Sequence, residues 1–287
     1  MTGFKHRLKS FIYQCSWARQ ICGAVYCLTG RRPWSFGYLF HKFVYIRNVV
    51  ENQSDSFRQG KLPDAYGAGM DERVVEYPWF FSQLSGSEQR ILDAGSSLNH
   101  YLILTAPQLK GRNLYLMTLA EEGEYRLKNQ PVYIYGDLRK TGFTEDFFDV
   151  VVSISTIEHV GMDNTFLYTD DQMKKEDVRL GFLDAVREFK RILKPGGSLY
   201  ITAPFGRYQH HGWFQIFDGE MVDHLIREFC PQSVEETYFK YENHQWNFST
   251  KAVCAPSIYF DIHKQKKIPG KEDLAASESV VCLVLKK

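Results

Sequence analysis

The first 50 residues of the chain contain no aspartate or glutamate. They carry eight lysine and arginine side chains and therefore a formal charge of +8. Because the whole chain carries a formal net charge of only +1, the remainder is acidic overall. Such an asymmetry indicates that the basic end meets an anionic partner, whereas the rest has the composition of an ordinary folded domain.

No uninterrupted apolar run is long enough to cross a bilayer. The best candidate, residues 11–28, is broken by Gln14, Arg19 and Gln20, and a spanning helix needs about 20 apolar residues. The six cysteines form no Cys-x-x-Cys pair, and no His, Asp or Glu cluster has the spacing of metal ligands. We therefore expect a cytoplasmic protein with free thiols and no bound metal.

Two regions of different character follow one another along the chain. Residues 1–50 are basic and crowded with aromatic side chains, and residues 51–70 are polar with several glycines. We interpret residues 1–70 as an N-terminal extension. Residues 71–287 show a regular pattern, apart from a late insertion at about residues 240–277, and are interpreted as one domain.

Short apolar runs alternate with helical periodicity in the second region. Residues 182–193 have the apolar spacing of a helix, which the breaker Lys194-Pro195-Gly196-Gly197 ends. Seven strands are predicted at residues 90–93, 114–119, 132–135, 148–154, 198–202, 234–241 and 279–285. This alternation predicts an α/β fold, with a doubly wound, mostly parallel seven-stranded sheet and a helical N-terminal extension.

The residues that follow the strands are the candidates for a binding site, because ligands of such sheets bind at the carboxyl ends of the strands. The first strand is followed by the segment Asp93–His100, the third by Gly136–Arg139 and the fourth by Ser155–Val160. Small residues after the first strand let a ligand approach the backbone. The Gly-x-Gly-x-x-Gly turn of nicotinamide dinucleotide sites is missing, which argues against an oxidoreductase of that class.

Several of these segments resemble, in order, the motifs of class I S-adenosylmethionine-dependent methyltransferases. The segments are ILDAGS (91–96), GDLRKTGFTEDFFDVVVSISTIEHVG (136–161) and FKRILKPGGSLYITAPFG (189–206). The likeness is good over residues 88–205 and implies a Rossmann-like methyltransferase fold with S-adenosylmethionine as cofactor. DERVVEYPW (71–79), LDAGSSLNH, MTLAEE and EHVGMDNT further resemble a little-characterised bacterial subgroup that is often found among genes for glycosyl transfer.

The resemblance implies roles for residues that match the family's motifs. Asp93, Gly95 and the neighbouring Ser96 would line the methionine end of the cofactor. Asp137 and Leu138 would flank the adenine, with the carboxylate accepting a hydrogen bond from the exocyclic amine.

Two further strand ends complete the implied cofactor site. Ser155 and Thr156 would lie beside the methionine moiety. At the end of the second strand the family usually has an acid that holds the ribose, but this sequence has Thr118. Glu121 or Glu122, just beyond it, would substitute for that acid.

His159 is the candidate general base for methyl transfer. It follows the fourth strand, and the ordinary pKa of histidine, about 6.5, suits proton removal near neutrality. Glu158 would orient it or bind the acceptor, and His210, His211 and Trp213 are second candidates for the acceptor pocket. Structural alternatives stand beside these roles: Asp93 as a turn residue, Asp137 as a cap, and the Glu158-His159 pair as a packing element.

The N-terminal extension has three interpretations. Mixed aromatic and basic side chains favour contact of residues 1–50 with an anionic membrane surface. Many relatives use such an extension as a lid over the cofactor, which is the second interpretation. Nucleic-acid binding through stacking and phosphate contacts is the third and least favoured.

The sequence thus predicts a methyltransferase that modifies an oxygen or nitrogen of a small-molecule or saccharide-containing acceptor. The saccharide rests on the subgroup resemblance alone. The alternative is a protein of the same fold that has lost catalysis and acts as a binding or scaffolding partner, because Thr118 and the altered glycine turn depart from the family pattern.

Overall fold

The computed structural model describes residues 15–121, 127, 131–261 and 274–287. The first of these ranges begins with helices α2 (Ser16–Leu28), α3 (Tyr38–Asn52), α4 (Ser54–Arg58) and α5 (Arg73–Gln83). The remaining helices are α6 (Tyr101–Leu104), α7 (Thr165–Tyr168), α8 (Phe182–Ile192), α9 (Gly219–Phe229) and α10 (Lys251–Cys254), with 3-10 turns at Pro107–Leu109, Ile157–His159 and Gln172–Lys174.

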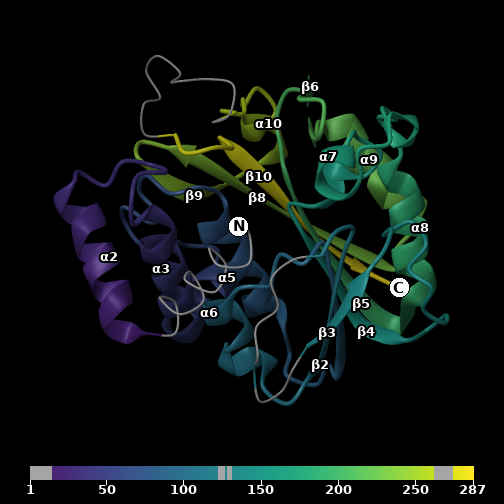
Figure 1. The fold of residues 1–287 in the computed structure, drawn as a ribbon, viewed down its shortest axis with the longest axis horizontal. Coiled ribbons are helices and arrows are strands. Elements are labelled where there is room, and N and C mark those ends of the chain that lie inside the picture. Colours follow the sequence, from purple (N-terminus) through teal and green to yellow (C-terminus); the bar gives the residue numbers. More distant parts are fainter. Residues whose placement is uncertain (1–14, 122–126, 128–130, 262–273) are drawn as a thin grey trace.

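One large sheet organises the molecule (Figure 1). Its strands lie in the order β3-β2-β1-β4-β5-β10-β8-β9. They are β1 (Arg90–Ala94), β2 (Asn113–Thr118), β3 (Val132–Tyr135), β4 (Phe148–Ile154), β5 (Leu193–Pro204), β8 (Ser233–Glu242), β9 (Gln245–Ser249) and β10 (Ser279–Lys286). The short pair β6 (Gln209–His210) and β7 (Gln215–Ile216) is separate.

The sheet confirms the predicted α/β fold and its mostly parallel character. Strands β1 to β5 pair in parallel, whereas β10 runs antiparallel to both β5 and β8. The chain order reverses at β1, which has β2 on one side and β4 on the other. This reversal is the position at which doubly wound sheets form a ligand crevice.

In the described residues the sheet has eight strands, one more than the seven expected. The additional strand, β9, pairs antiparallel with β8, and Tyr241 lies opposite Trp246. The two strands are joined at Asn243 and His244, both of which have left-handed backbone conformations with φ of 53° and 62°. Two consecutive left-handed residues are what a tight hairpin turn requires, so the start of the late insertion folds back onto the sheet.

Helices cover both faces of the sheet, as alternation of side chains along each strand demands. Ile91, Val150 and Val152 point to the face packed by α3, α5 and α6. Leu92 and Val151 point to the opposite face, which α8 and α9 cover. Figure 1 shows these two helical layers on either side of the sheet.

The described part of the N-terminal extension is helical and belongs to the same body as the sheet. α2 packs on α3, and α3 packs on α5. A buried ion pair joins Lys42 of α3 to Asp71, with 2.5 Å between Nζ and Oδ2. The indole of Trp34 donates to the carbonyl of Ala275, 2.6 Å away. In the described ranges no helix is both long and apolar enough to span a bilayer.

Candidate functional site

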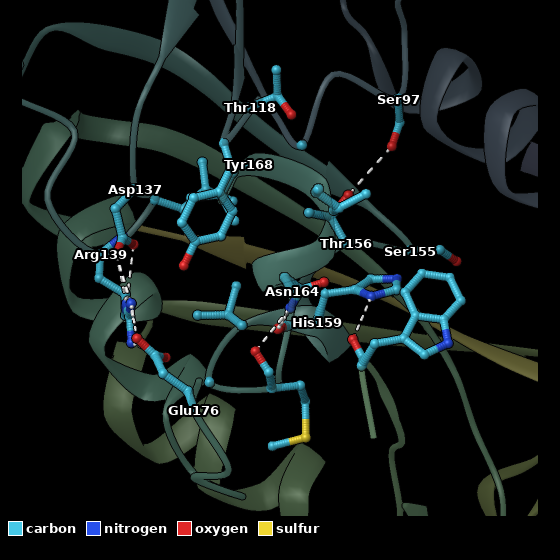
Figure 2. A pocket seen from close by; sticks show the side chains of 18 of the residues that line it. Ser97, Thr118, Asp137, Arg139, Ser155, Thr156, His159, Asn164, Tyr168 and Glu176 are labelled. Carbon is cyan, nitrogen blue, oxygen red and sulfur yellow. Dashed lines mark hydrogen bonds and ion pairs between the residues drawn. The ribbon is translucent and has the colours of Figure 1, made fainter. Parts of the chain in front are cut away.

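A cavity opens at the carboxyl ends of β1, β2 and β4 and beside the loop that follows β3 (Figure 2). The strand-order reversal at β1 therefore coincides with a hollow, as expected for a doubly wound sheet. Of the residues predicted for the site, those that line the cavity are Gly95, Thr118, Asp137, Leu138, Ser155, Thr156, His159 and Trp213. No residue of the range 15–70 lines it.

The turn after β1 is built around the buried carboxylate of Asp93. Its oxygens accept hydrogen bonds from the backbone N–H groups of Ser97, at 3.2 Å, and Leu98, at 2.6 Å. Neither Asp93 nor Ser96 is among the cavity-lining residues, whereas Ser97 is. Ser97 donates through Oγ to the carbonyl of Ile154, 2.7 Å away, and so ties the turn to β4. Asp93 thus stabilises the turn by accepting hydrogen bonds from its backbone.

At Gly95 the turn after β1 comes close to Thr156, in the segment after β4. The φ of Gly95, 123°, lies in the region that glycine adopts most readily. A Cβ atom at this position would overlap the side chain of Thr156. The hydrogen atom of glycine is therefore required both by the backbone conformation and by the space available, which leaves the backbone open to the cavity.

The end of β2 contributes Thr118 and Leu119 to the cavity wall. Glu121, the predicted substitute for the family's ribose acid, is exposed and is not among the lining residues. Glu122 lies outside the described residues. In the described ranges, Thr118 is therefore the predicted ribose contact that reaches the cavity from β2.

The loop after β3 contains Asp137 and Arg139, and Arg139 forms ion pairs with two carboxylates. Arg139 donates from Nε and Nη2 to the carboxylate of Asp137, at 3.0 and 2.6 Å, and from Nη1 and Nη2 to Glu176, at 2.6 and 2.8 Å (Figure 2). Burial raises the pKa of Asp137, but the hydrogen bonds from Arg139 outweigh it, so the net pKa is lowered. Asp137 is therefore an ionised acceptor at the cavity rim, and Arg139 links it to the segment between β4 and α8.

The segment after β4 places His159 in the cavity with a defined tautomer. Its Nδ1 lies 2.9 Å from the carbonyl oxygen of Trp213 (Figure 2). A carbonyl oxygen can only accept, so Nδ1 carries the proton and Nε2 keeps its lone pair. Burial, with a smaller contribution from the positive charge of Arg73, lowers the pKa of His159 to about 4, against the hydrogen bond to Trp213. The imidazole is neutral at pH 7.

Glu158 and two of the three acceptor-pocket candidates, His210 and His211, are not among the cavity-lining residues, whereas Trp213 is. Glu158 is buried and is not a lining residue, and burial raises its pKa well above the usual range. No hydrogen bond joins it to His159 among the described residues. His210 lies near the surface, with Nε2 2.8 Å from the carboxylate of Asp177. The ring of His211 stacks on Phe214 at 4.4 Å.

The cavity region also holds residues that the sequence did not predict, and Arg73 and Glu76 are two of them. Both come from α5, which lies far from the strand ends in sequence. The buried carboxylate of Glu76 accepts from the hydroxyls of Ser155, at 2.5 Å, and Thr202, at 2.7 Å. It also accepts from Nη1 of Arg73, at 2.7 Å. The motif at residues 71–79 was part of the family resemblance, but nothing in its pattern shows that these two side chains reach across to β4 and β5.

The segment between β4 and α8 forms the remaining wall. Asn164, Leu167, Tyr168 and Glu176 line the cavity from this side. The amide of Asn164 donates to the backbone carbonyl of His159, 2.7 Å away, and so fixes the histidine's backbone. In the parts of the chain that the structure describes, no three His, Cys, Asp or Glu side chains group closely enough to hold a metal ion.

Comparisons with known proteins bear on the same part of the chain. Residues 92–201 match the family model described as a methyltransferase domain. None of the curated proteins compared with the chain matches it.

Solved structures show weak likenesses. One is a SAM-dependent methyltransferase from Archaeoglobus fulgidus, 11% identical over 70% of this chain and 87% of that chain, with a TM-score of 0.44. Another is the 1,6-didemethyltoxoflavin-N1-methyltransferase of Burkholderia thailandensis with bound S-adenosylhomocysteine, 13% identical over 86% of this chain and 90% of that chain, with a TM-score of 0.44. Likenesses of this size identify neither a substrate nor a site residue. The match over residues 92–201, from β1 to β5, makes this part of the chain similar to a methyltransferase domain and supports S-adenosylmethionine as the cofactor.

Proposed function

We propose that the protein is an S-adenosylmethionine-dependent methyltransferase that acts on an oxygen or nitrogen of a small-molecule or saccharide-containing acceptor. The observation that carries the proposal is the convergence of Gly95, Thr118, Asp137 and His159 on one cavity at the strand-order reversal. All four belong to the segment that matches the methyltransferase domain.

The cavity residues fit the parts of the cofactor in turn. The backbone of Gly95, which lines the cavity without a Cβ atom, suits the methionine end. The hydroxyl of Thr118 suits a ribose hydroxyl. A carboxylate has about four acceptor sites, so Asp137 keeps one for the adenine amine while the backbone N–H, Nε and Nη2 of Arg139 donate to it. When bound, the cofactor supplies an activated methyl group on a sulfonium ion.

His159 would receive the proton that the acceptor loses. Its Nε2 lone pair is the one that the Trp213 carbonyl leaves unused. Methyl transfer depends mainly on holding the nucleophile in line with the methyl group, and an acceptor O–H or N–H that donates to Nε2 would be held in this way. The low pKa of about 4 makes His159 a weak base, which favours acceptors whose proton is readily lost.

Titration calorimetry with S-adenosylhomocysteine tests the cofactor site. We expect micromolar binding to the wild type and at least a tenfold higher Kd for Asp137→Ala, because a hydrogen bond to a charged group contributes about 1.5–3 kcal/mol. Asp64→Ala removes an exposed acid outside the cavity and is the control. If folded wild type binds neither S-adenosylmethionine nor S-adenosylhomocysteine, the non-catalytic scaffold becomes the better hypothesis.

We further propose that the extension contacts an anionic membrane surface. Three large apolar side chains of α2 are exposed, beside the polar Gln20: Trp17, Ile21 and Leu28 are 61%, 55% and 86% exposed. Residues 1–50 carry +8 and no acid. Apolar and aromatic side chains beside basic ones suit the membrane interface, where each basic residue contributes about 1 kcal/mol.

Flotation with lipid vesicles tests this contact. We expect wild type to float with vesicles rich in phosphatidylglycerol and to stay behind with pure phosphatidylcholine. The double variant Trp17→Ser/Ile21→Ser should reduce the bound fraction at least tenfold, because burial of each side chain contributes up to about 1.5–3 kcal/mol. Met173→Ser, which removes another exposed apolar side chain, should have no effect. Equal binding by the double variant and wild type would remove the proposal.

A further inference from the structure

We infer that Arg73 recognises a carboxylate or similar anionic group of a ligand in the cavity, an inference that rests on the proposed function for the identity of that ligand. Arg73 is the first residue of α5 and lines the cavity together with His159 and Trp213. Its side chain is 26% exposed, so the guanidinium is enclosed on most sides but reachable from the cavity.

The hydrogen bonds of the guanidinium are incomplete on the side away from Glu76. Nη1 donates to Oε2 of Glu76, 2.7 Å away. Nε and Nη2 make no hydrogen bond to a described residue. These two nitrogens form one edge of the planar group, which matches the two oxygens of a carboxylate. Largely enclosed donors normally have partners, so this edge is suited to a ligand.

Arg139, which lines the same cavity, differs from Arg73 in that its guanidinium nitrogens all have protein hydrogen-bond partners. Its Nε–Nη2 edge donates to Asp137 and its Nη1–Nη2 edge to Glu176, so both edges contact protein carboxylates. Arg73 has one protein carboxylate and one open edge. The difference between the two arginines indicates that Arg139 holds the cavity wall together, whereas Arg73 has donors left for a ligand.

The charge around Arg73 also leaves it able to attract an anion. Glu76 is its direct partner and shares its oxygens with the hydroxyls of Ser155 and Thr202. Glu72 and Glu158 lie nearby, but burial raises the pKa of Glu72 to about 7 and that of Glu158 well above the usual range. The raised pKa values weaken the negative charge of both carboxyl groups, so they cancel less of the positive charge of the guanidinium.

The anion has two candidate sources, which ligands of different structure distinguish. The methionine end of the cofactor carries a carboxylate, and an acceptor can bring a carboxylate or phosphate of its own. 5′-Methylthioadenosine retains the nucleoside and the sulfur but lacks the amino-acid end. Comparing the affinities of S-adenosylhomocysteine and 5′-methylthioadenosine therefore tests whether Arg73 binds the amino-acid end of the cofactor.

Titration calorimetry of wild type, Arg73→Lys and Arg73→Gln with these ligands is the test. Arg73→Lys keeps a positive charge beside Glu76 but loses the two-donor edge, and so remains informative if Arg73→Gln does not fold. If Arg73 binds the cofactor's carboxylate, Arg73→Lys raises the Kd for S-adenosylhomocysteine at least tenfold and leaves that for 5′-methylthioadenosine unchanged. Arg58→Lys, a conservative change at an exposed ion pair, should alter neither.

A second arm covers the acceptor. Inorganic phosphate is titrated into each protein, free and saturated with S-adenosylhomocysteine. Phosphate binding by wild type that Arg73→Lys weakens at least tenfold, with unchanged S-adenosylhomocysteine affinity, assigns Arg73 to an acceptor's anionic group. Arg73→Lys that binds every probe as wild type does overturns the inference. Wild type that binds neither nucleoside overturns the proposed function instead, and the phosphate titration of the free protein then decides the role of Arg73.

Discussion

Replacing Glu76 with alanine is expected to lower the free energy of unfolding by about 3–5 kcal/mol, the usual cost of removing one partner of a buried ion pair. The carboxylate is fully buried and accepts three hydrogen bonds, from Arg73, Ser155 and Thr202. Its loss leaves the guanidinium and two hydroxyls without their acceptor, in a place where water does not replace it. It also removes the hydrogen bonds from α5 to Ser155, just after β4, and to Thr202 of β5.

Urea unfolding followed by circular dichroism measures the effect. Glu76→Gln keeps the shape and one acceptor oxygen, so it should cost less than Glu76→Ala. Glu145→Ala removes an exposed acid and should change the free energy of unfolding by less than about 0.5 kcal/mol. A loss of under about 1 kcal/mol for Glu76→Ala would show that the hydrogen bonds around this carboxylate contribute little to stability.

Replacing Gly95 with alanine is expected to reduce the affinity for S-adenosylhomocysteine at least a hundredfold. The added Cβ would overlap the Thr156 side chain, and φ of 123° is strained for any other residue. Overpacking and backbone strain each cost about 1–3 kcal/mol. The turn after β1 can relieve them by moving into the cavity, where the cofactor would lie.

Gly111→Ala is the matched control for this substitution. Gly111 also has a positive φ, of 79°, but a Cβ there would meet open space. Calorimetry should therefore show wild-type affinity for Gly111→Ala, despite a similar backbone penalty. If Gly95→Ala also binds as wild type does while keeping its melting temperature, close approach at Gly95 is not part of the cofactor site.

Much of the fold follows from patterns that are visible along single strands. The run of Val and Ile at residues 148–154 favours a strand buried on both faces, which β4 confirms. The predicted helix ends at Ile192, before the predicted breaker Lys194-Pro195-Gly196-Gly197, and the structure includes the breaker residues in β5. The strand that was not predicted, β9, has no run of Val and Ile. Its partly buried residues Gln245 and Asn247 are polar and favour the prediction of a loop. Its hairpin depends on left-handed Asn243 and His244, and histidine is not a residue that signals such a turn.

The residues of the candidate site also divide into those that a local sequence pattern predicts and those that only tertiary packing brings to the site. Gly95, Asp137 and His159 follow strands, so the predicted strands alone are enough to bring them to one edge of the sheet. Arg73 and Glu76 reach that edge only because α5 packs across the sheet, a tertiary contact with no local pattern. Nor could the sequence show that Asp93 turns its carboxylate to the backbone of Ser97 and Leu98, because a turn residue and a ligand contact have the same local sequence.

The position of β10 has a consequence for biosynthesis. This strand lies between β5 and β8, although it follows both in the chain. On the ribosome, β5 and β8 emerge first, each with an unpaired edge that another chain can pair with. The two halves of the sheet stay separate until residues 279–286 have left the exit tunnel and inserted between them. Aggregation of this protein during synthesis should therefore depend on how long that gap stays open, which slower translation of the last strand would prolong and a chaperone that shields strand edges would shorten.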